Sequence, residues 1–177
     1  FLVPEEVAGR CRSAVARGEE LALAWSETRS AWAVSYPELA SELERRLDEA
    51  MDTAHADEAV HMLFYMDLDR FKAVNDSCGH VAGDNMLREV ATLIKEQVRD
   101  SDYVGRLGGD EFGALLVGCP IEKARQIAND ICNAIADYRF VWKDKIFNIG
   151  ISIGLVEISP ASGSLQDVMS AADSACY

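Results

Sequence analysis

Two acidic motifs in this sequence have residue types and a spacing that suit a metal-assisted reaction on phosphate. The first is Asp67-Leu68-Asp69, at the end of an apolar run, and the second is Asp110-Glu111, directly after two glycines in RLGGDEFGALL. Adjacent carboxylates repel one another and contribute nothing to folding by themselves. Their positions at a strand end and at a glycine turn therefore point to a chemical role.

A hard divalent cation would explain both acidic pairs. If the strands that carry them are neighbours, Asp67 and Asp110 converge, and several carboxylates in one small volume require a cation among them. Mg²⁺ prefers oxygen ligands and completes its octahedron with water and nucleotide phosphates. Gly108 and Gly109 would let a phosphate chain approach the backbone, and Lys72 could supply positive charge. Acids at strand ends are also often plain solvated side chains, so spacing alone leaves both interpretations open.

The elements that must position these residues alternate between strands and helices. Strands are expected at 61–69, at 103–107 and 112–118 around the glycine turn, and at 140–142 and 146–153. Helical periodicity is found at 4–35, 38–54, 79–99, 121–138 and from 165 onward. The mixture, with a hairpin at its centre, predicts an α+β fold in which helices pack on a sheet. Arg106 is expected to be a surface or sheet-edge cation, and Phe112 a core residue.

Composition limits the class of protein. The 177 residues, 49% of them apolar, suit one domain with an extension. A net charge of −13 argues against nucleic acid or an anionic membrane as partner. The five cysteines form no CxxC pair, so we expect free thiols and a cytoplasmic location. No segment approaches the roughly 20 apolar residues of a membrane span, although a longer parent protein could carry an anchor.

The motifs LGGDEF and DLDRFKAVNDSCGHVAGDNML closely resemble the GGDEF-domain family of bacterial diguanylate cyclases, which join two GTP molecules into cyclic di-GMP. The resemblance is strong from His61 to Val117 and weaker from Pro37 to Tyr177. It implies a palm-like nucleotidyl-cyclase fold with a central, mostly antiparallel sheet flanked by helices. The domains expected are a helical extension or signalling linker at 1–35 and a GGDEF domain at 36–177 with a truncated C-terminal end.

The resemblance also implies metal-binding and catalytic residues. Asp67 and the main-chain carbonyl of Leu68 match metal ligands, and Asp110 and Glu111 match acids that bind metal and serve catalysis. The cofactor implied is Mg²⁺ or Mn²⁺, two ions per GTP. Which of Asp110 and Glu111 acts as the base stays open, and Asp69 is expected to play a supporting structural role.

A guanine site is implied by the same comparison. Asn75 and Asp84 match the pair that hydrogen-bonds the base, with His80 beside them. An aspartate can accept from the N1 and N2 hydrogens of guanine, whereas adenine would leave it unpaired. Four further residues are assigned to the substrate site: Phe71, Lys72, Gly108 and Gly109. Outside the family pattern, Asn75 and Asp84 also suit helix-cap and turn positions, and a lone His80 suits a structural role.

The stretch RDSD, five residues ahead of the signature, resembles the family's product-inhibition site. There Arg99 would pair with phosphate and stack on guanine, and Asp102 would bind the guanine edge. The alternative is a helix that ends in a cation, which suits the helix dipole, followed by acids in a loop.

The implied reaction needs two copies of the domain. Each would hold one GTP, and the 3′-hydroxyl of one would attack the α-phosphorus of the other. The partners expected are therefore GTP, cyclic di-GMP as product and inhibitor, a homodimer, and a sensor domain outside this segment, with no nucleic acid and no membrane contact. The alternative function is a catalytically silent regulatory module that binds GTP or cyclic di-GMP.

Two departures from the family pattern concern the ends of the domain. Around 30–39 the chain reads SAWAVSYPEL where the family has Asp-x-Leu-Thr-Gly-Leu-x-Asn-Arg. We expect either a diverged motif or missing residues between Ser35 and Tyr36. In the family, a phosphate-binding lysine and a final strand follow the stretch that corresponds to ADSACY. The sequence given ends at Tyr177, before both of them.

Overall fold

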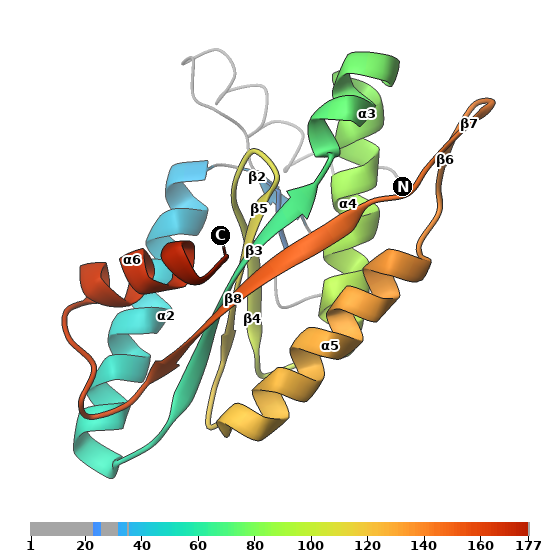
Figure 1. The fold of residues 1–177 in the computed structure, drawn as a ribbon. Helices are drawn as coiled ribbons and strands as arrows, with labels where there is room; N and C mark the ends of the chain where they lie inside the picture. Colours follow the sequence, from blue (N-terminus) through green and yellow to red (C-terminus); the bar gives the residue numbers. More distant parts are fainter. Residues whose placement is uncertain (1–22, 26–31, 35, 177) are drawn as a thin grey trace.

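The structure, a computed structural model, describes residues 23–25, 32–34 and 36–176. Its framework is a six-stranded sheet in the order β2-β1-β4-β5-β3-β8, and every recorded pair in it is antiparallel (Figure 1). The strands of this sheet are β1 (Leu23–Trp25), β2 (Trp32–Val34), β3 (His61–Asp69), β4 (Tyr103–Gly108), β5 (Glu111–Leu116) and β8 (Gly150–Ile158).

A separate hairpin and the helices complete the fold. The hairpin consists of β6 (Phe140–Trp142) and β7 (Lys145–Phe147). The helices are α2 (Tyr36–Asp57), α3 (Phe71–Cys78), α4 (His80–Gln97), α5 (Ile121–Asp137) and α6 (Leu165–Cys176). Among the described residues, no helix is both long and apolar enough to cross a lipid bilayer.

Strand β3 is the centre of the molecule, because it pairs with β5 on one side and with β8 on the other. Its alternate side chains enter two cores on opposite faces. Phe64 and Leu68 join the core that α4 and α5 cover, whereas Leu63 joins the core that α2 and α6 cover (Figure 1). A strand buried on both faces reads as the continuous apolar run that the sequence shows, and only its end can carry exposed acids.

Helix α6 approaches β8 so closely that a glycine is required there. A Cβ atom built on Gly154 would lie 2.7 Å from the backbone nitrogen of Cys176, a distance that real Cβ contacts do not reach. The helix backbone therefore rests directly on the strand beside the end of β3 that carries Asp67.

Most of the predicted architecture is confirmed. The α+β class, the antiparallel sheet flanked by helices, the central hairpin, and the helices α2, α4, α5 and α6 all agree with expectation. Two details were wrong. The strand expected at 146–153 is divided into β7 and β8. Helix α3 was not predicted, because only Phe71 and Val74 are buried in it and two positions are too few to show a helical period.

The helix predicted at Pro4–Ser35 is wrong where the structure describes that segment. Leu23–Trp25 and Trp32–Val34 are strands, and Ala24 pairs with Gly105 of β4. An edge strand that offers unpaired backbone groups can override a modest helical preference. The rest of the segment lies outside the described residues, and the division into domains at 35/36 remains a prediction.

His61, the first residue of β3, is a buried polar side chain with both ring nitrogens engaged. Its Nδ1 accepts the backbone N–H of Gly118 at 3.1 Å, and its Nε2 lies 3.0 Å from Thr53 Oγ1 of α2. An Nδ1 that accepts a hydrogen bond carries no proton, so the fold holds the neutral ring with its proton on Nε2. Burial lowers the pKa of His61 below 6.5, which agrees with this assignment.

This arrangement predicts a specific pH dependence of stability. Unfolded histidine gains a proton below about pH 6.5, whereas native His61 resists protonation, so the free energy of unfolding should fall as the pH drops from that value. His61→Gln should cost about 1 to 3 kcal/mol at neutral pH through an unpaired Gly118 N–H, and it should flatten the acid dependence. Urea unfolding of both proteins across this range measures the difference, and equal pH slopes would show that His61 is not its source.

Candidate functional site

The two acidic motifs meet where β3 ends and β5 begins. Asp67 and Glu111 are direct partners in the antiparallel register of these strands, so their side chains lie on the same face of the sheet. Asp110 occupies the turn, and its carbonyl oxygen accepts the N–H of Leu68 at 3.2 Å. The two motifs are adjacent, but the residue opposite Asp67 is Glu111 rather than Asp110, and the convergence of the Asp67 and Asp110 side chains remains a prediction. A shift of one residue in register changes which side chain shares the face.

The turn that presents these acids is held by a buried cation. Gly109 has φ +43°, a left-handed conformation that favours glycine, and a β-bulge lies between Arg106 and Gly108. Arg106 donates from Nε to the carbonyl oxygen of Gly109 at 2.8 Å, and from Nη2 to the same atom. Arg106 is only 7% exposed, so its interpretation as a surface or sheet-edge cation is wrong. Its guanidinium fixes the backbone of the turn from inside the fold.

The oxygen donors at this turn suit a Mg²⁺ ion whose coordination shell is completed by substrate phosphates. Among residues 36–176, no three His, Cys, Asp or Glu side chains lie close enough to hold a metal ion by themselves. Mg²⁺ does not require such a cage, because it is commonly bound through one or two carboxylates plus substrate phosphates. Asp67 and Glu111 supply facing carboxylates, and Asp110 is adjacent. The metal roles of these acids and of the Leu68 carbonyl remain predictions.

Helix α4 packs closely against Asn75 of α3, one of the expected guanine ligands. A Cβ atom on Gly83 of α4 would overlap Asn75 Oδ1 of α3 and would lie 3.1 Å from Phe71 Cζ. Asn75 Oδ1 is buried and has no hydrogen-bond partner. A buried, unpaired amide oxygen costs about 1 to 3 kcal/mol, so a ligand that donates to it would recover that cost. Asp84, the next residue along α4, is exposed.

The remaining substrate candidates differ in exposure. Lys72 is exposed at the start of α3, and His80 is exposed at the start of α4, one turn before Asp84. Phe71 is buried against Gly83, so it shapes the Asn75 site from within. Gly108 and Gly109 lie at the hairpin turn, and a Cβ atom on Gly109 would meet no other atom within 4 Å.

Two further side chains support the loops around the site. Asp69 accepts a hydrogen bond from Ser152 Oγ at 3.2 Å, which agrees with the structural role expected for it. Lys145 of β7 donates to the Ser77 carbonyl at 3.0 Å, which ties the β6-β7 hairpin to the end of α3. Sequence analysis missed Lys145, because partners so far apart in the chain leave no local signal.

The RDSD segment is folded inward at its acidic end. Asp102 is 4% exposed, and its two carboxylate oxygens accept the backbone N–H groups of Arg99 at 3.0 Å and Val117 at 3.3 Å. These bonds give Asp102 a structural role at the turn before β4, and a contact between Asp102 and guanine would require them to be shared or broken. Arg99 itself is exposed. Its part in product binding remains a prediction.

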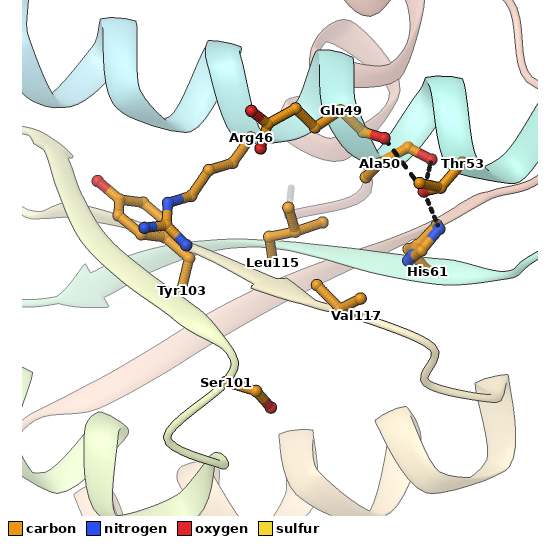
Figure 2. A pocket seen from close by; sticks show the side chains of 9 residues that line it. All are labelled: Arg46, Glu49, Ala50, Thr53, His61, Ser101, Tyr103, Leu115 and Val117. Carbon is orange, nitrogen blue, oxygen red and sulfur yellow. Dashed lines mark hydrogen bonds between the residues drawn. The ribbon is translucent and has the colours of Figure 1, made fainter. Parts of the chain in front are cut away.

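A cavity of about 170 Å³ lies between α2 and the strands β3, β4 and β5 (Figure 2). Its lining consists of Arg46, Glu49, Ala50, Thr53, His61, Ser101, Tyr103, Leu115 and Val117. The Arg46 guanidinium lies over the Tyr103 ring, 5.0 Å from its centre, and burial raises the pKa of Tyr103 to about 12. None of the predicted catalytic or substrate residues lines this cavity, so it is separate from the candidate site.

Comparison with known proteins identifies the family. The sequence profile described as "Diguanylate cyclase, GGDEF domain" matches residues 40–177. "Probable diguanylate cyclase DgcE" of Escherichia coli (strain K12) is 47% identical over 134 residues, which cover 76% of this chain and 12% of that protein.

Two solved structures of GGDEF domains have the same fold. That of PA1120 (YfiN or TpbB) from Pseudomonas aeruginosa aligns with TM-score 0.72 and 32% identity, over 77% of this chain and 86% of that one. That of DgcB from Caulobacter crescentus, in complex with c-di-GMP, aligns with TM-score 0.73 and 26% identity, over 78% and 82%.

The antiparallel sheet flanked by helices is thus the fold of solved GGDEF domains. The chain belongs to the GGDEF-domain diguanylate cyclase family. The match spans 12% of the length of DgcE.

The contact between Gly83 and Asn75 predicts a sensitive position on α4. Gly83→Ala places a methyl group on the Asn75 amide and should displace it, while Ala is otherwise favoured in a helix. We expect the KM for GTP to rise about 10-fold, since the predicted hydrogen bond between Asn75 and the base would be lost. Ala91→Gly on the same helix is the control for altered helix propensity. A Gly83→Ala enzyme with unchanged KM would show that Asn75 does not bind the base.

Proposed function

We propose that this chain condenses two GTP molecules into cyclic di-GMP with release of pyrophosphate. The observation that carries the proposal is the direct pairing of Asp67 with Glu111 across β3 and β5, at a turn open to a ligand at Gly109. Membership of the family supports the same reaction. The buried, unpaired oxygen of Asn75 supports a base as part of the ligand.

Some residues of this chain supply negative charge, and others hold the substrate in position. Asp67, Glu111 and Asp110 hold negative charge at the strand end, and Asn75 and Asp84 hold the guanine base. A bound Mg²⁺ or Mn²⁺ supplies Lewis acidity, which lowers the pKa of the attacking 3′-hydroxyl and stabilises charge on the α-phosphate. The fixed turn keeps the phosphates in line with the attacking group, and such positioning accounts for much of phosphoryl-transfer catalysis.

Control of the reaction follows from its symmetry. Each chain contributes one half of the active site, so the working unit is a homodimer in which the two GTP molecules face each other. In this proposal the protein is cytoplasmic, and a sensor domain elsewhere in it controls the reaction. The product cyclic di-GMP inhibits the enzyme by binding at the exposed Arg99. A chain that binds GTP but never forms cyclic di-GMP would instead be a regulatory module.

Removal of one facing charge tests the reaction itself. Asp67→Asn should reduce cyclic di-GMP formation from GTP and Mg²⁺ by about 100-fold or more, because charge compensation at the transition state is lost. Asp130→Asn on α5 is the matched control, since it makes the same change at an exposed position on another element. Chromatography of the products gives the rates. Wild-type turnover in Asp67→Asn would remove the metal-site interpretation, and absence of product from the wild type would remove the proposed reaction.

Removal of Arg99 tests feedback control. Arg99→Ala should bind cyclic di-GMP about 10-fold more weakly or worse, and its progress curve should stay linear longer, since a guanidinium can both pair with phosphate and stack on a base. Arg88→Ala, also an exposed arginine and one that bonds within α4, is the control. Calorimetry and progress curves provide the measurement. Equal product affinity and equally early inhibition in Arg99→Ala would place the inhibitory site elsewhere.

A further inference from the structure

A tyrosine on the central strand contacts one of the facing acids. Tyr65 lies two residues before Asp67 on β3, so both side chains occupy the face that Glu111 shares. The Tyr65 hydroxyl donates a hydrogen bond to Glu111 Oε1 at 2.7 Å. Because Tyr65 pairs with Gly113 in register, this bond runs diagonally across the two strands, within the normal reach of an aromatic side chain.

We propose that Tyr65 is a positioning residue for Glu111. The inference rests on the proposed function, because it assumes that Glu111 helps to hold the divalent ion beside Asp67. The hydroxyl engages Oε1 and restrains the rotamer of the glutamate, which would leave the remaining lone pairs of the carboxylate available to the ion. Tyr65 acts only through Glu111 in this proposal, and it contacts neither nucleotide nor metal.

The electrostatics of the pair explain why such a residue is needed. Like charges directly opposite in a sheet destabilise the pairing, and a glutamate at a strand end can turn its carboxylate away into solvent. The hydroxyl of Tyr65 opposes that movement with a short hydrogen bond to a carboxylate, which is stronger than a bond between neutral groups. A lysine or arginine in its place would neutralise Glu111 and compete with the cation. A neutral donor holds the carboxylate and leaves its charge for the metal.

Tyr65 is itself held in place by packing. Its ring is half-buried against the core between the sheet, α2 and α6. The position opposite it on β5 is a glycine, and a Cβ atom on Gly113 would lie 3.0 Å from Leu43 Cδ2 and 3.3 Å from Leu107 Cδ1. The packing of the ring against this core restrains it, and the hydroxyl in turn restrains the carboxylate of Glu111.

A second tyrosine provides a matched control. Tyr138, after α5, donates to Glu89 Oε2 of α4 at 2.6 Å. This bond has the same chemistry, but it joins two helices that cover the opposite face of the sheet (Figure 1). Tyr138→Phe therefore removes one tyrosine–glutamate bond without touching the candidate site.

The experiment compares the wild type, Tyr65→Phe, Tyr138→Phe, Glu111→Gln and the double variant Tyr65→Phe/Glu111→Gln. Binding of Mn²⁺ in the presence of a non-hydrolysable GTP analogue is measured by electron paramagnetic resonance, in the cold, where each variant is confirmed as folded by circular dichroism. The Mg²⁺ concentration for half-maximal cyclic di-GMP synthesis and the KM for GTP at saturating Mg²⁺ are measured in parallel.

We expect Tyr65→Phe to weaken Mn²⁺ binding and raise the Mg²⁺ requirement by about 10- to 100-fold, which is typical when a group that orients a metal ligand is removed. The KM for GTP at saturating Mg²⁺ should stay unchanged, and Tyr138→Phe should equal the wild type. The double variant should bind Mn²⁺ as Glu111→Gln does, because Tyr65 acts through Glu111.

Three results would overturn the inference. Metal binding and Mg²⁺ dependence of Tyr65→Phe equal to the wild type would exclude a positioning role and leave the proposed function intact. A double variant weaker than Glu111→Gln would mean that Tyr65 acts on another group. A wild type that neither binds Mn²⁺ with the analogue nor forms cyclic di-GMP would overturn the proposed function and the inference together.

Discussion

The antiparallel register of β3 and β5 is the constraint on which the candidate site depends. It places Asp67 opposite Glu111 and Tyr65 opposite Gly113, so two acids and one neutral donor share a face. Because side chains alternate along a strand, a slip of one residue would turn the acids to opposite faces. The two cores on either side of β3 make such a slip costly, since the same slip would move Phe64 and the other buried side chains of the strand into the opposite core, where they do not fit.

The site combines a rigid frame with a pair of facing acids and one buried, unpaired amide oxygen. Arg106 holds the Gly109 carbonyl from inside the fold, and Asp102 holds backbone N–H groups at the start of β4. In contrast, the acids face each other, and Asn75 Oδ1 lacks a partner. Stability that comes from the cores allows the fold to maintain such unfavourable groups at the strand end, where a cation and a base would compensate them.

Much of this organisation can be predicted from the sequence. The apolar run of β3 that ends in acids, the glycine turn of the hairpin, and the periodic helices α2, α4, α5 and α6 are all local patterns that burial and turn chemistry impose. The motifs also indicated the family correctly. Local patterns were misleading at Leu23–Trp25 and Trp32–Val34, where pairing with the sheet replaced the predicted helix.

What the sequence by itself determined is therefore most of the elements, without α3, β1 and β2, and the position of the acids at strand ends, because both follow from local patterns along the chain. The tertiary structure decided which groups meet. It paired Asp67 with Glu111, buried Arg106 and turned Asp102 inward. These outcomes depend on register and on packing between segments distant in sequence. A cation or a carboxylate is stable in the interior only where such segments bring partners beside it.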